Sequence, residues 1–389
     1  MEVKQICNLM NTVTNEIIGT SDIVKEDLSN IVDVGNEILN SNNIDNYVKS
    51  LVNQIGKVIF VNRPYSGGAS NVLMDSWEYG SILEKISAEL PDAVENDSWQ
   101  LTDGQDYSPN VFHKPVVSAK FFNKKVTFEV DLSFTERQVK ESFLNAAQLN
   151  GFMSMLYNSV DKAMTVKIDS LIQRTINNMI AETIISEYKG TGSSLLPLNS
   201  KSGIKAVNLL KLFNDKESAT LTAEKAMTDK NFIRFASMTM TLYIDRMKKI
   251  STLFNIGKKA RFTPNDMLNI IMLTDFKAAT STYLQADTYH DNYTALPKSE
   301  SIPYWQSSGN DYSFETISSI HVNTSSNIDV EASGILAVMF DRDSIGVTNL
   351  DRRVTTNYNA KAEFYNNFYK FDAGYFNDFN ENFIVFFVA

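Results

Sequence analysis

The sequence predicts an α+β fold in which one very long helix lies among strands and shorter helices. Apolar residues recur at steps of three and four over 152–188, with no Pro or Gly between them, which predicts an uninterrupted helix. Strand-like runs rich in Val, Ile and Phe occupy 57–62, 116–132 and 382–389. At 1.5 Å per residue the helix would be roughly 55 Å long. A helix of this length suits a wide, flat body better than a compact sphere.

One face of the predicted helix 152–188 is apolar. The apolar positions are Met153, Leu156, Val160, Met164, Ile168, Leu171, Ile176, Met179, Ile184 and Tyr188. Gly190 and Gly192 mark its end. Charged residues recur every few positions, so the segment is not a membrane span. A long helix packed on a sheet is favoured over a free coiled coil, because sustained heptads with charged flanks are missing.

The N-terminal third predicts extended elements. Residues 1–55 are polar and weakly helical, an arm that needs another surface to lie against. The run 81–90 alternates without a clean apolar face, so a strand and a short helix both remain open. The range 116–132 predicts a longer strand. The acidic range 91–115 between them is expected to be the tip of a two-stranded arm, since long structureless loops are uncommon inside compact domains. An isolated hairpin is marginal in water, so such an arm needs a surface to rest on.

A capping box precedes the long helix. Thr135 is followed three residues later by Gln138, which predicts the start of a helix that runs to about Gln148. Asn150 and Gly151 are expected to separate this helix from the long one.

Helix and strand segments alternate over 201–330, which favours a separate α/β domain. The expected helices are 204–213, 229–250 and 275–285, and the expected strands are 267–274 and 317–322. The chain then returns to strands at 334–342, 353–371 and 382–389. Eleven aromatic residues lie between Phe364 and Phe387. Core packing is favoured over stacking on bases, because only Lys361 and Lys370 supply positive charge there.

Charge is unevenly distributed in this 389-residue chain of net charge −10. Residues 1–56 carry −5, 57–74 carry +2, 75–106 carry −8, and the remainder carries +1. No stretch is a dense basic block, so sequence-independent grip on a phosphate backbone is not indicated. The acidic segment 75–106 could meet basic groups on a partner or could be a solvated loop, and both interpretations remain open.

Signatures of catalysis and metal binding are missing. The chain has no glycine-rich phosphate loop and no His-Glu-x-x-His, and its three His lack partners at metal-ligand spacing. Asp287 and Asp291 could form a carboxylate pair, although such turns are usually solvated. A Ser-His-Asp triad stays open, since its members can lie far apart in sequence. One Cys and no secretory pattern favour folding in a reducing cytoplasm. An interaction or structural protein is therefore favoured over an enzyme.

The order of parts resembles the major capsid proteins of tailed bacteriophages with the Hong Kong 97-type fold, in particular those of short-tailed phages of Gram-positive bacteria. The residues that carry the resemblance are Trp77-Glu78-Tyr79-Gly80, Ile82-Leu83-Glu84-Lys85-Ile86, Val111-Phe112-His113-Lys114, Phe134-Thr135-Glu136-Arg137-Gln138, Phe340-Asp341-Arg342-Asp343, Asp351-Arg352-Arg353 and Phe371-Asp372. The likeness lies in order and texture over nearly the whole chain and includes no short diagnostic motif.

The resemblance implies five parts. They are an N-terminal arm (1–55), an extended β-hairpin loop region (56–118), a peripheral domain (119–200) that contains the spine helix 152–188, an inserted α/β axial domain (201–330), and return strands of the peripheral domain (331–389). A neighbouring subunit would lie under the extended loop.

The resemblance also implies a function. Such a protein self-assembles as hexamers and pentamers into an icosahedral shell around double-stranded DNA, without a catalytic site, cofactor or metal. A separate scaffolding protein and a portal are expected partners, DNA would be contacted non-specifically, and no membrane is involved. The location would be the virion, after assembly in the host cytoplasm. The alternatives are a hydrolase with a site at His290 or His321 in 201–330, and a tail or connector protein.

The residues expected at contacts between subunits are the acidic loop and basic groups that could receive it. They are Asp75, Glu78, Glu84, Glu89, Asp92, Glu95, Asp97, Trp99, Asp103 and Asp106, with Lys162, Lys167, Arg174, Arg352 and Arg353. Exposed ion pairs are individually worth under about 1 kcal/mol, so such an interface would need many contacts and apolar burial.

Overall fold

The computed structural model describes most of the chain from residue 112 onward and shorter pieces before it. The described residues are 11–12, 70–74, 83–88, 93, 95–107, 110, 112–135, 137–138, 146–192, 194–285, 299–306, 311–324 and 327–389. The predicted strand 57–62 and all but two residues of the predicted arm 1–55 lie outside them. The chain divides into two compact units. Unit 1 comprises Met1–Ser76, Lys125–Ile172 and Val347–Gly374, and unit 2 comprises Trp77–Lys124, Gln173–Gly346 and Tyr375–Ala389.

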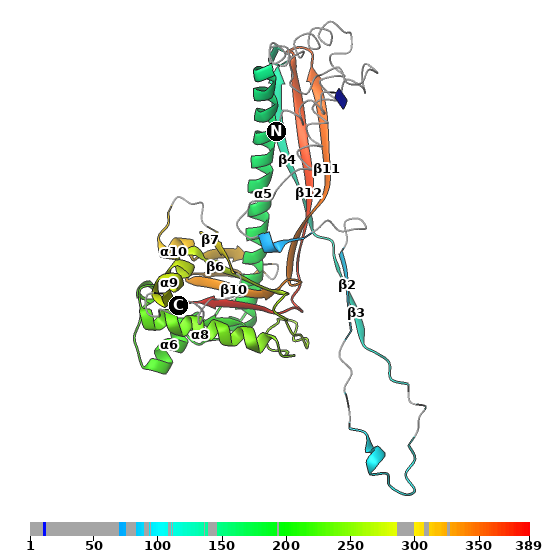
Figure 1. The fold of residues 1–389 in the computed structure, drawn as a ribbon, viewed down its shortest axis with the longest axis vertical. Helices are drawn as coiled ribbons and strands as arrows, with labels where there is room; N and C mark the ends of the chain where they lie inside the picture. The colour runs from blue at the N-terminus through cyan, green and yellow to red at the C-terminus, as the bar shows by residue number, and fades with distance from the viewer. Residues whose placement is uncertain are drawn as a thin grey trace. The chain divides into compact units, whose positions relative to one another are not determined.

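A four-stranded sheet in the order β1-β11-β12-β4 dominates the described part of unit 1 (Figure 1). Its strands are β1 (Leu73–Met74), β4 (Lys125–Thr135), β11 (Ile345–Asn359) and β12 (Phe364–Asn377). Strands β12 and β4 are antiparallel, with Phe364 opposite Thr135 and Gly374 opposite Lys125. Aromatic cross-strand neighbours line one face, where the rings of Phe128 and Phe371 lie 5.1 Å apart. Such pairs stabilise antiparallel sheets.

Two ranges that were each predicted as a single strand are wrong, because each contains parts of two strands. The range 116–132 forms β3 (Val117–Phe122) and most of β4, which are separated by Asn123 and Lys124. The range 353–371 contains a turn between β11 and β12. There the Asn359 side chain accepts bonds from the backbone N–H groups of Lys361 (3.1 Å) and Ala362 (3.2 Å). An Asx turn of this kind reverses the chain within a run whose residue types remain strand-like throughout.

Helix α5 (Ala146–Tyr188) confirms the predicted uninterrupted helix and extends it at the N-terminal end. Its predicted apolar face is buried from Val160 to Tyr188. The predicted break at Asn150 and Gly151 is wrong, because both residues lie inside the helix. A glycine in a helix interior costs only about 1 kcal/mol, which a helix of this length tolerates. No helix in the described ranges has an apolar stretch that could cross a bilayer.

The capping box before α5 is confirmed. The Thr135 backbone N–H donates to the Gln138 side chain at 2.9 Å, and the Gln138 N–H donates to the Thr135 hydroxyl at 3.3 Å. These two reciprocal bonds satisfy N–H groups that a helix start leaves without partners.

Unit 2 contains a five-stranded sheet in the order β5-β13-β10-β6-β7. Its strands are β5 (Ala206–Asn208), β6 (Leu268–Leu273), β7 (Ser299–Ile302), β10 (Ile335–Asp341) and β13 (Phe383–Phe387). Strands β10 and β13 are buried along their whole length. The predicted strand at 382–389 is thus confirmed, and β13 lies in the interior of the sheet. The sheet combines strands from both sides of the predicted boundary at 330/331, and the domain limits remain predictions.

Helices and a second ribbon accompany this sheet. They are α6 (Leu209–Glu217), α7 (Ala223–Ala226), α8 (Lys230–Met247), α9 (Thr274–Gln285), α10 (Phe314–Ile317), and the antiparallel pair β8 (Ile320–Asn323) and β9 (Asp329–Ala332). The predicted helices 229–250 and 275–285 are confirmed. The predicted helix 204–213 is wrong in its first half. Residues 206–208 pair in parallel with β13, and Asn208 then caps α6 by accepting the Lys211 N–H at 3.0 Å.

The alternative left open for 81–90 is resolved as a strand. Strand β2 (Leu83–Ala88) pairs antiparallel with β3, with Leu83 opposite Phe122 and Ala88 opposite Val117. Within the connection between β2 and β3 the described residues include only a 3-10 turn, η2 (Asp97–Trp99); another, η1 (Ser70–Val72), precedes β1. We call β2 and β3 the ribbon, and residues 89–116 the connection. The antiparallel pairing of β2 with β3 confirms the predicted two-stranded arm.

Candidate functional site: a clamped ribbon with an exposed apolar face

The ribbon has one charged face that is partly buried and one apolar face that is exposed. Along β2, half-buried and exposed residues alternate, because successive side chains of a strand point to opposite faces. The exposed side chains of the outer face are Glu84, Ile86, Ala88, Val117, Ala119 and Phe121, and on the other face Ser118 is exposed as well. Ile86 is 66% exposed and Phe121 is 62% exposed. Side chains of this size are rarely left uncovered over a continuous surface, so the outer face of the ribbon is a candidate contact surface.

Two lysines on the other face lie directly opposite each other, which by itself would weaken the ribbon. Lys85 and Lys120 are cross-strand partners, and like charges in that position repel. Asp378 lies between them. Its Oδ2 is 3.0 Å from Lys85 Nζ, and its Oδ1 accepts from Lys120 Nζ at 2.9 Å. One nearly buried carboxylate therefore binds both strands of the ribbon.

A second carboxylate extends this network. Glu381 Oε1 lies 2.8 Å from Lys85 Nζ and 3.2 Å from Arg261 Nε. We call Lys85, Lys120, Arg261, Asp378 and Glu381 the clamp. All five residues belong to unit 2. Because each lysine has a carboxylate partner, the repulsion between the two lysines is compensated. The same ion pairs attach the ribbon to the rest of unit 2.

The pKa values of the clamp follow from these contacts. Burial alone would raise the pKa of Asp378, but the hydrogen bond from Lys120 and the charge of Lys85 hold it below its ordinary value. Burial alone would lower the pKa of Lys85, but the bond to Glu381 and the charge of Asp378 raise it. Both groups are therefore charged near neutral pH, and the clamp is an ionic attachment.

Aromatic packing supports the clamp. The rings of Phe122 and Phe376 lie 5.0 Å apart, and Lys120 Nζ lies 5.2 Å from the Phe122 ring centre. The Asp378 backbone N–H donates to the Ser344 carbonyl at 2.7 Å, which fixes the acidic residue itself. The ribbon is thus attached at the end where β2 begins and β3 ends.

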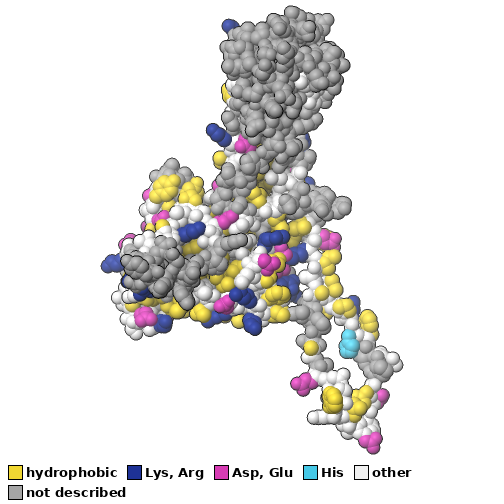
Figure 2. Space-filling model, in the orientation of Figure 1, with side chains coloured by type: hydrophobic (Ala, Val, Ile, Leu, Met, Phe, Trp, Pro, Cys, Tyr) yellow, Lys and Arg dark blue, Asp and Glu magenta, His cyan; other side chains and the backbone are white. Residues whose placement is uncertain are grey.

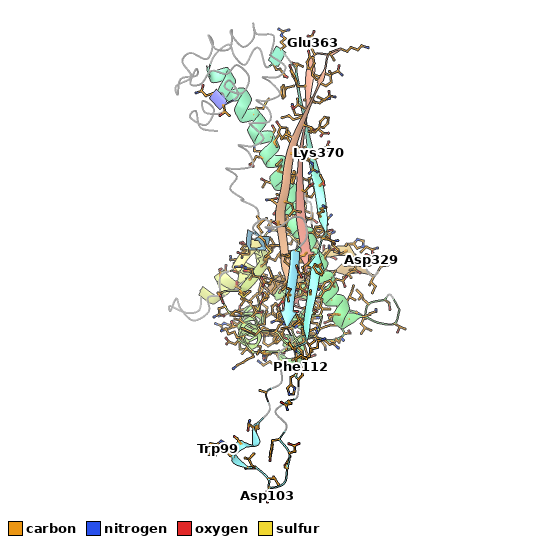
Figure 3. All side chains as sticks on the ribbon, turned by 90° about the vertical axis from the view of Figure 1, so that its right-hand side faces the viewer. Trp99, Asp103, Phe112, Asp329, Glu363 and Lys370 are labelled. Atoms are coloured by element: carbon orange, nitrogen blue, oxygen red, sulfur yellow. The ribbon has the colours of Figure 1, made fainter. Side chains whose placement is uncertain are left out.

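The connection carries large apolar side chains in solvent. Trp99 is 95% exposed and Phe112 is 83% exposed, and Leu101 is exposed as well. Figure 3 shows Trp99, Asp103 and Phe112 in this segment, and Figure 2 shows hydrophobic side chains along it. The Tyr107 hydroxyl accepts the Thr102 backbone N–H at 3.0 Å. Few other contacts hold the described part of the connection, so its apolar groups are available to a partner.

The structure places only part of the predicted acidic set. Glu84, Glu95, Trp99, Asp103 and Asp106 are exposed on the ribbon and the connection. The remaining acidic candidates lie outside what the structure describes, by whole residue or by side chain: Asp75, Glu78, Glu89, Asp92 and Asp97. Contact of the whole acidic set with a neighbouring subunit stays a prediction.

The predicted basic partners differ in the contacts they make within their own subunit. Lys162, Lys167 and Arg174 are exposed on α5, where Arg174 lies over the ring of Tyr375 at 5.1 Å. Arg353 Nη1 pairs with Asp372 Oδ2 of its own chain at 2.9 Å. The side chain of Arg352 lies outside the described set. These contacts engage Arg174 and Arg353 within the subunit.

Two groups of residues were missed by sequence reasoning. The clamp joins residues more than 250 positions apart, such as Lys85 and Asp378, and no sequence pattern signals it. The statement that no stretch is a dense basic block is wrong for 246–261, which holds six Lys and Arg and no acid. Counting charges in wide windows hid this segment, and a window of about sixteen residues would have found it.

The hydrolase hypothesis finds little support in the described residues. His321 Nε2 lies 2.8 Å from Asp329 Oδ1, and the hydrogen bond raises the pKa of His321. Both side chains are about two-thirds exposed on the β8–β9 ribbon, where water is not excluded. His290, Asp287 and Asp291 lie outside the described residues. Where the structure describes the chain, no three His, Cys, Asp or Glu side chains gather as metal ligands would.

Comparison with known proteins decides between the hypotheses. Residues 10–387 match the family described as Phi29-like phage major capsid protein. The chain belongs to this family. The match covers nearly the whole sequence, so this capsid protein is a structural component of the phage head, and the predicted resemblance is confirmed. The α+β fold class, with a long helix among sheets, is confirmed as well.

Solved structures with a similar fold are phage capsids. The capsid structure of Staphylococcus phage Andhra is 10% identical to this chain, with a TM-score of 0.49. The aligned region covers 84% of this chain and 86% of the phage Andhra chain. The mature capsid of bacteriophage PhiM1 is 8% identical, with a TM-score of 0.43 and coverages of 84% and 89%. The capsid of cyanophage P-SCSP1u is 11% identical, with a TM-score of 0.44 and the same coverages, 84% and 89%. No curated protein sequence matches. The family membership rests on the match over residues 10–387.

Proposed function

We propose that this capsid protein assembles as hexamers and pentamers into an icosahedral shell around double-stranded phage DNA, and that the ribbon and connection of each subunit lie across a neighbour. The observation that supports this most directly is the ribbon, which is clamped by charge at one end and exposes apolar side chains along its outer face. A neighbour that covers Ile86, Phe121 and Trp99 would remove this apolar surface from water.

The physical argument starts from the instability of the ribbon by itself. A two-stranded hairpin is marginally stable in water, and among the described residues the ribbon is attached to the rest of the subunit at its root. Burial of its outer face at about 25 cal/mol per Å² would add the stabilisation that the ribbon lacks. Because the donating and the receiving surfaces are different patches of one chain, the contact is heterologous and can close into a ring.

The remaining partners follow from the family and from charge. We propose that the packaged DNA is contacted non-specifically and only weakly, because a chain with a net charge of −10 has little positive charge available to neutralise phosphates. We propose a separate scaffolding protein and a portal as assembly partners. Assembly would take place in the host cytoplasm, and the final location would be the virion.

The test is deletion of residues 92–110, joined by a short Gly-Ser linker, in protein expressed with its native scaffold. We expect the variant to keep the far-ultraviolet circular dichroism and thermal transition of the wild type, because those of the deleted residues that the structure describes contribute nothing to the buried core. Electron microscopy should show no closed shells. A matched control is Tyr312→Ala, an exposed aromatic residue outside the ribbon, which should assemble normally. Normal shells from the deletion variant would contradict the proposal.

A further inference from the structure

We propose that the basic segment 246–262 of one subunit is the surface that receives the acidic, aromatic connection of the next subunit, through Glu95–Asp106. This inference rests on the proposed function and names the receiving surface, for which sequence analysis suggested Lys162, Lys167, Arg174, Arg352 and Arg353. We call residues 246–262 the basic loop.

The fold brings two separate basic groups of the basic loop together. Arg246, Lys248 and Lys249 lie at the end of α8 and just after it, and Lys258, Lys259 and Arg261 follow about ten residues later. Ser251 and Arg261 form an isolated antiparallel bridge, with reciprocal backbone bonds of 2.9 and 3.0 Å. The bridge closes the loop, so positive charge that is split in sequence gathers at one place.

The basic loop is held firmly against the core. Phe254 is buried, and its carbonyl accepts the Phe383 N–H at 2.9 Å. The Asn255 side chain is also buried; it donates to the Lys259 carbonyl at 2.7 Å and accepts the Lys259 N–H at 2.8 Å. A preorganised surface of this kind loses little conformational entropy on binding.

Gly257 shows how close the loop lies to its support. Its N–H donates to the Phe379 carbonyl at 2.7 Å. A Cβ at this position would lie 2.1 Å from the Asn380 side-chain oxygen, so the backbone approaches as closely as a glycine permits.

The exposed groups of the basic loop suit a partner that is both acidic and apolar. Ile250, Leu253 and Phe262 are each more than half exposed. Among the described residues, Lys249 and Lys258 have no carboxylate within ion-pair distance. Interfaces with an apolar centre and charged surroundings bind and orient their partners in this way.

The connection has the complementary chemistry. It exposes Glu95, Asp103 and Asp106 together with Trp99 and Leu101. Phosphate groups would satisfy the lysines but not the three exposed apolar side chains, so a protein segment is favoured over DNA as the occupant. The stretch 161–169 of α5, which holds Lys162 and Lys167, is less suitable, because Asp161 and Asp169 leave it without net positive charge.

The position of the basic loop indicates which part of one subunit would meet which part of the next. Glu381 Oε1 binds Arg261 of the basic loop and also Lys85 of the ribbon, so the receiving surface lies at the root of the subunit's own ribbon. Trp99 follows the end of β2 by eleven residues, which can span roughly 35 Å. The tip of one connection would therefore bind at the root of the next ribbon, and each subunit would both donate and receive.

The first test is disulfide crosslinking in a Cys7→Ser background, which removes the single native cysteine. Leu101→Cys is combined with Leu253→Cys, and the matched control combines Leu101→Cys with Met238→Cys, an exposed residue elsewhere on α8. Assembled particles are oxidised and analysed by non-reducing gel electrophoresis. We expect a ladder of covalent multimers for the first pair and none for the control.

The outcomes separate the two proposals. Particles that give no ladder with the first pair, or equal ladders with both pairs, overturn the basic loop as the receiving surface and leave the shell proposal standing. Failure of the wild-type and Cys7→Ser chains to form any particles overturns the proposed function, and this inference with it.

The second test is a charge swap. Lys249→Glu with Lys258→Glu should lower the yield of particles by about tenfold, because like charges would then face each other. Adding Asp103→Lys and Asp106→Lys to the same chain should restore the yield, whereas Lys162→Glu with Lys167→Glu should leave it unchanged. If the first pair leaves the yield of particles unchanged and instead abolishes binding of a duplex DNA oligonucleotide, the basic loop faces nucleic acid and the proposal is overturned.

Discussion

The sheet strands β10 and β13 and the ribbon strands β2 and β3 are stabilised in opposite ways. Every residue of β10 and β13 is buried, with the rings of Phe340 and Phe383 stacked 5.7 Å apart. The ribbon buries none of its residues completely and is attached through the clamp. The sheet is therefore stable within one subunit, whereas the ribbon leaves apolar surface exposed. The same residue types form the buried core in one place and, in the proposed shell, would contact a neighbouring subunit in the other.

The largest expected effect is a difference in the free energy of unfolding when a phenylalanine is replaced by alanine in each of the two regions. Phe386→Ala removes a fully buried ring that packs edge-on against Tyr243, and should lower the free energy of unfolding by about 3–5 kcal/mol. Phe121→Ala on the exposed face of the ribbon should change it by no more than about 0.5 kcal/mol while reducing the yield of particles. Urea unfolding of the monomer and electron microscopy measure the two effects. Equal losses of stability would contradict the comparison.

Removal of the carboxylate of the clamp should detach the ribbon without unfolding the sheet. Asp378→Asn leaves Lys85 and Lys120 facing each other without the charge between them, and should destabilise the ribbon by about 1–3 kcal/mol. Hydrogen exchange should speed up in 83–88 and 117–122 and stay slow in 335–341. As a control, Asp372→Asn, which alters a carboxylate of unit 1, should leave the exchange of the ribbon unchanged.

Acid should loosen the ribbon through the same carboxylate. Because the folded pKa of Asp378 lies below its ordinary value, the stabilisation is present above about pH 4 and is lost as the pH falls through the folded pKa. On the alkaline side, Lys85 has a raised pKa, so its contribution holds below about pH 10 and is lost as the pH rises through the folded pKa. The charged groups that face Asp378 and Lys85 are Lys120, Arg261 and Glu381.

Hydrogen exchange of the ribbon measured from pH 3 to pH 7 tests this dependence, after correction for the intrinsic exchange rate. Asp341 has the opposite effect on the pH dependence of stability. Burial raises its pKa in the folded protein, so its contribution to the stability of the folded state increases as the pH falls. The loss in acid should therefore be specific to the ribbon and absent from Asp378→Asn. An equal acid dependence in wild type and Asp378→Asn would show that another group controls the attachment.

A small effect, with no change in particle yield, is expected at an ion pair outside both regions. Arg353 pairs with Asp372 across the exposed face of the unit 1 sheet, and its side chain is 46% exposed. Arg353→Ala should change the free energy of unfolding by less than about 1 kcal/mol, since solvent and salt screen such a pair. Thermal unfolding at low and high salt measures it. A larger loss would mean that Arg353 contributes more by packing than by charge.

Local signals in the sequence predicted the elements that carry their own periodicity. The spacing from Val160 to Tyr188 fixed the apolar face of α5, and Thr135 with Gln138 fixed the capping box. The errors arose where tertiary pairing overrides local preference. Residues 206–208 became a strand only because β13 lies beside them, and Gly151 did not end α5 because a long helix tolerates one glycine.

The candidate site was predicted in part. The acidic, aromatic character of 91–115 and its two-stranded base follow from composition and alternation, which are local properties. The clamp does not, since Lys85 and Asp378 meet only after the chain has folded around the sheet of unit 2. The charge of the basic loop was visible in sequence, but its concentration depends on the bridge between Ser251 and Arg261.

By itself, the sequence determined where the chain forms its long helix, which of its strands are apolar, and where its acidic charge lies. Periodicity and composition act between near neighbours, so they can be read without knowing the fold. Only the tertiary structure decided which charges meet, because the Coulomb energy of an ion pair depends on distances between atoms. Asp378 holds the two lysines of the ribbon, and Glu381 links the ribbon to the basic loop, through contacts that no spacing in the sequence encodes.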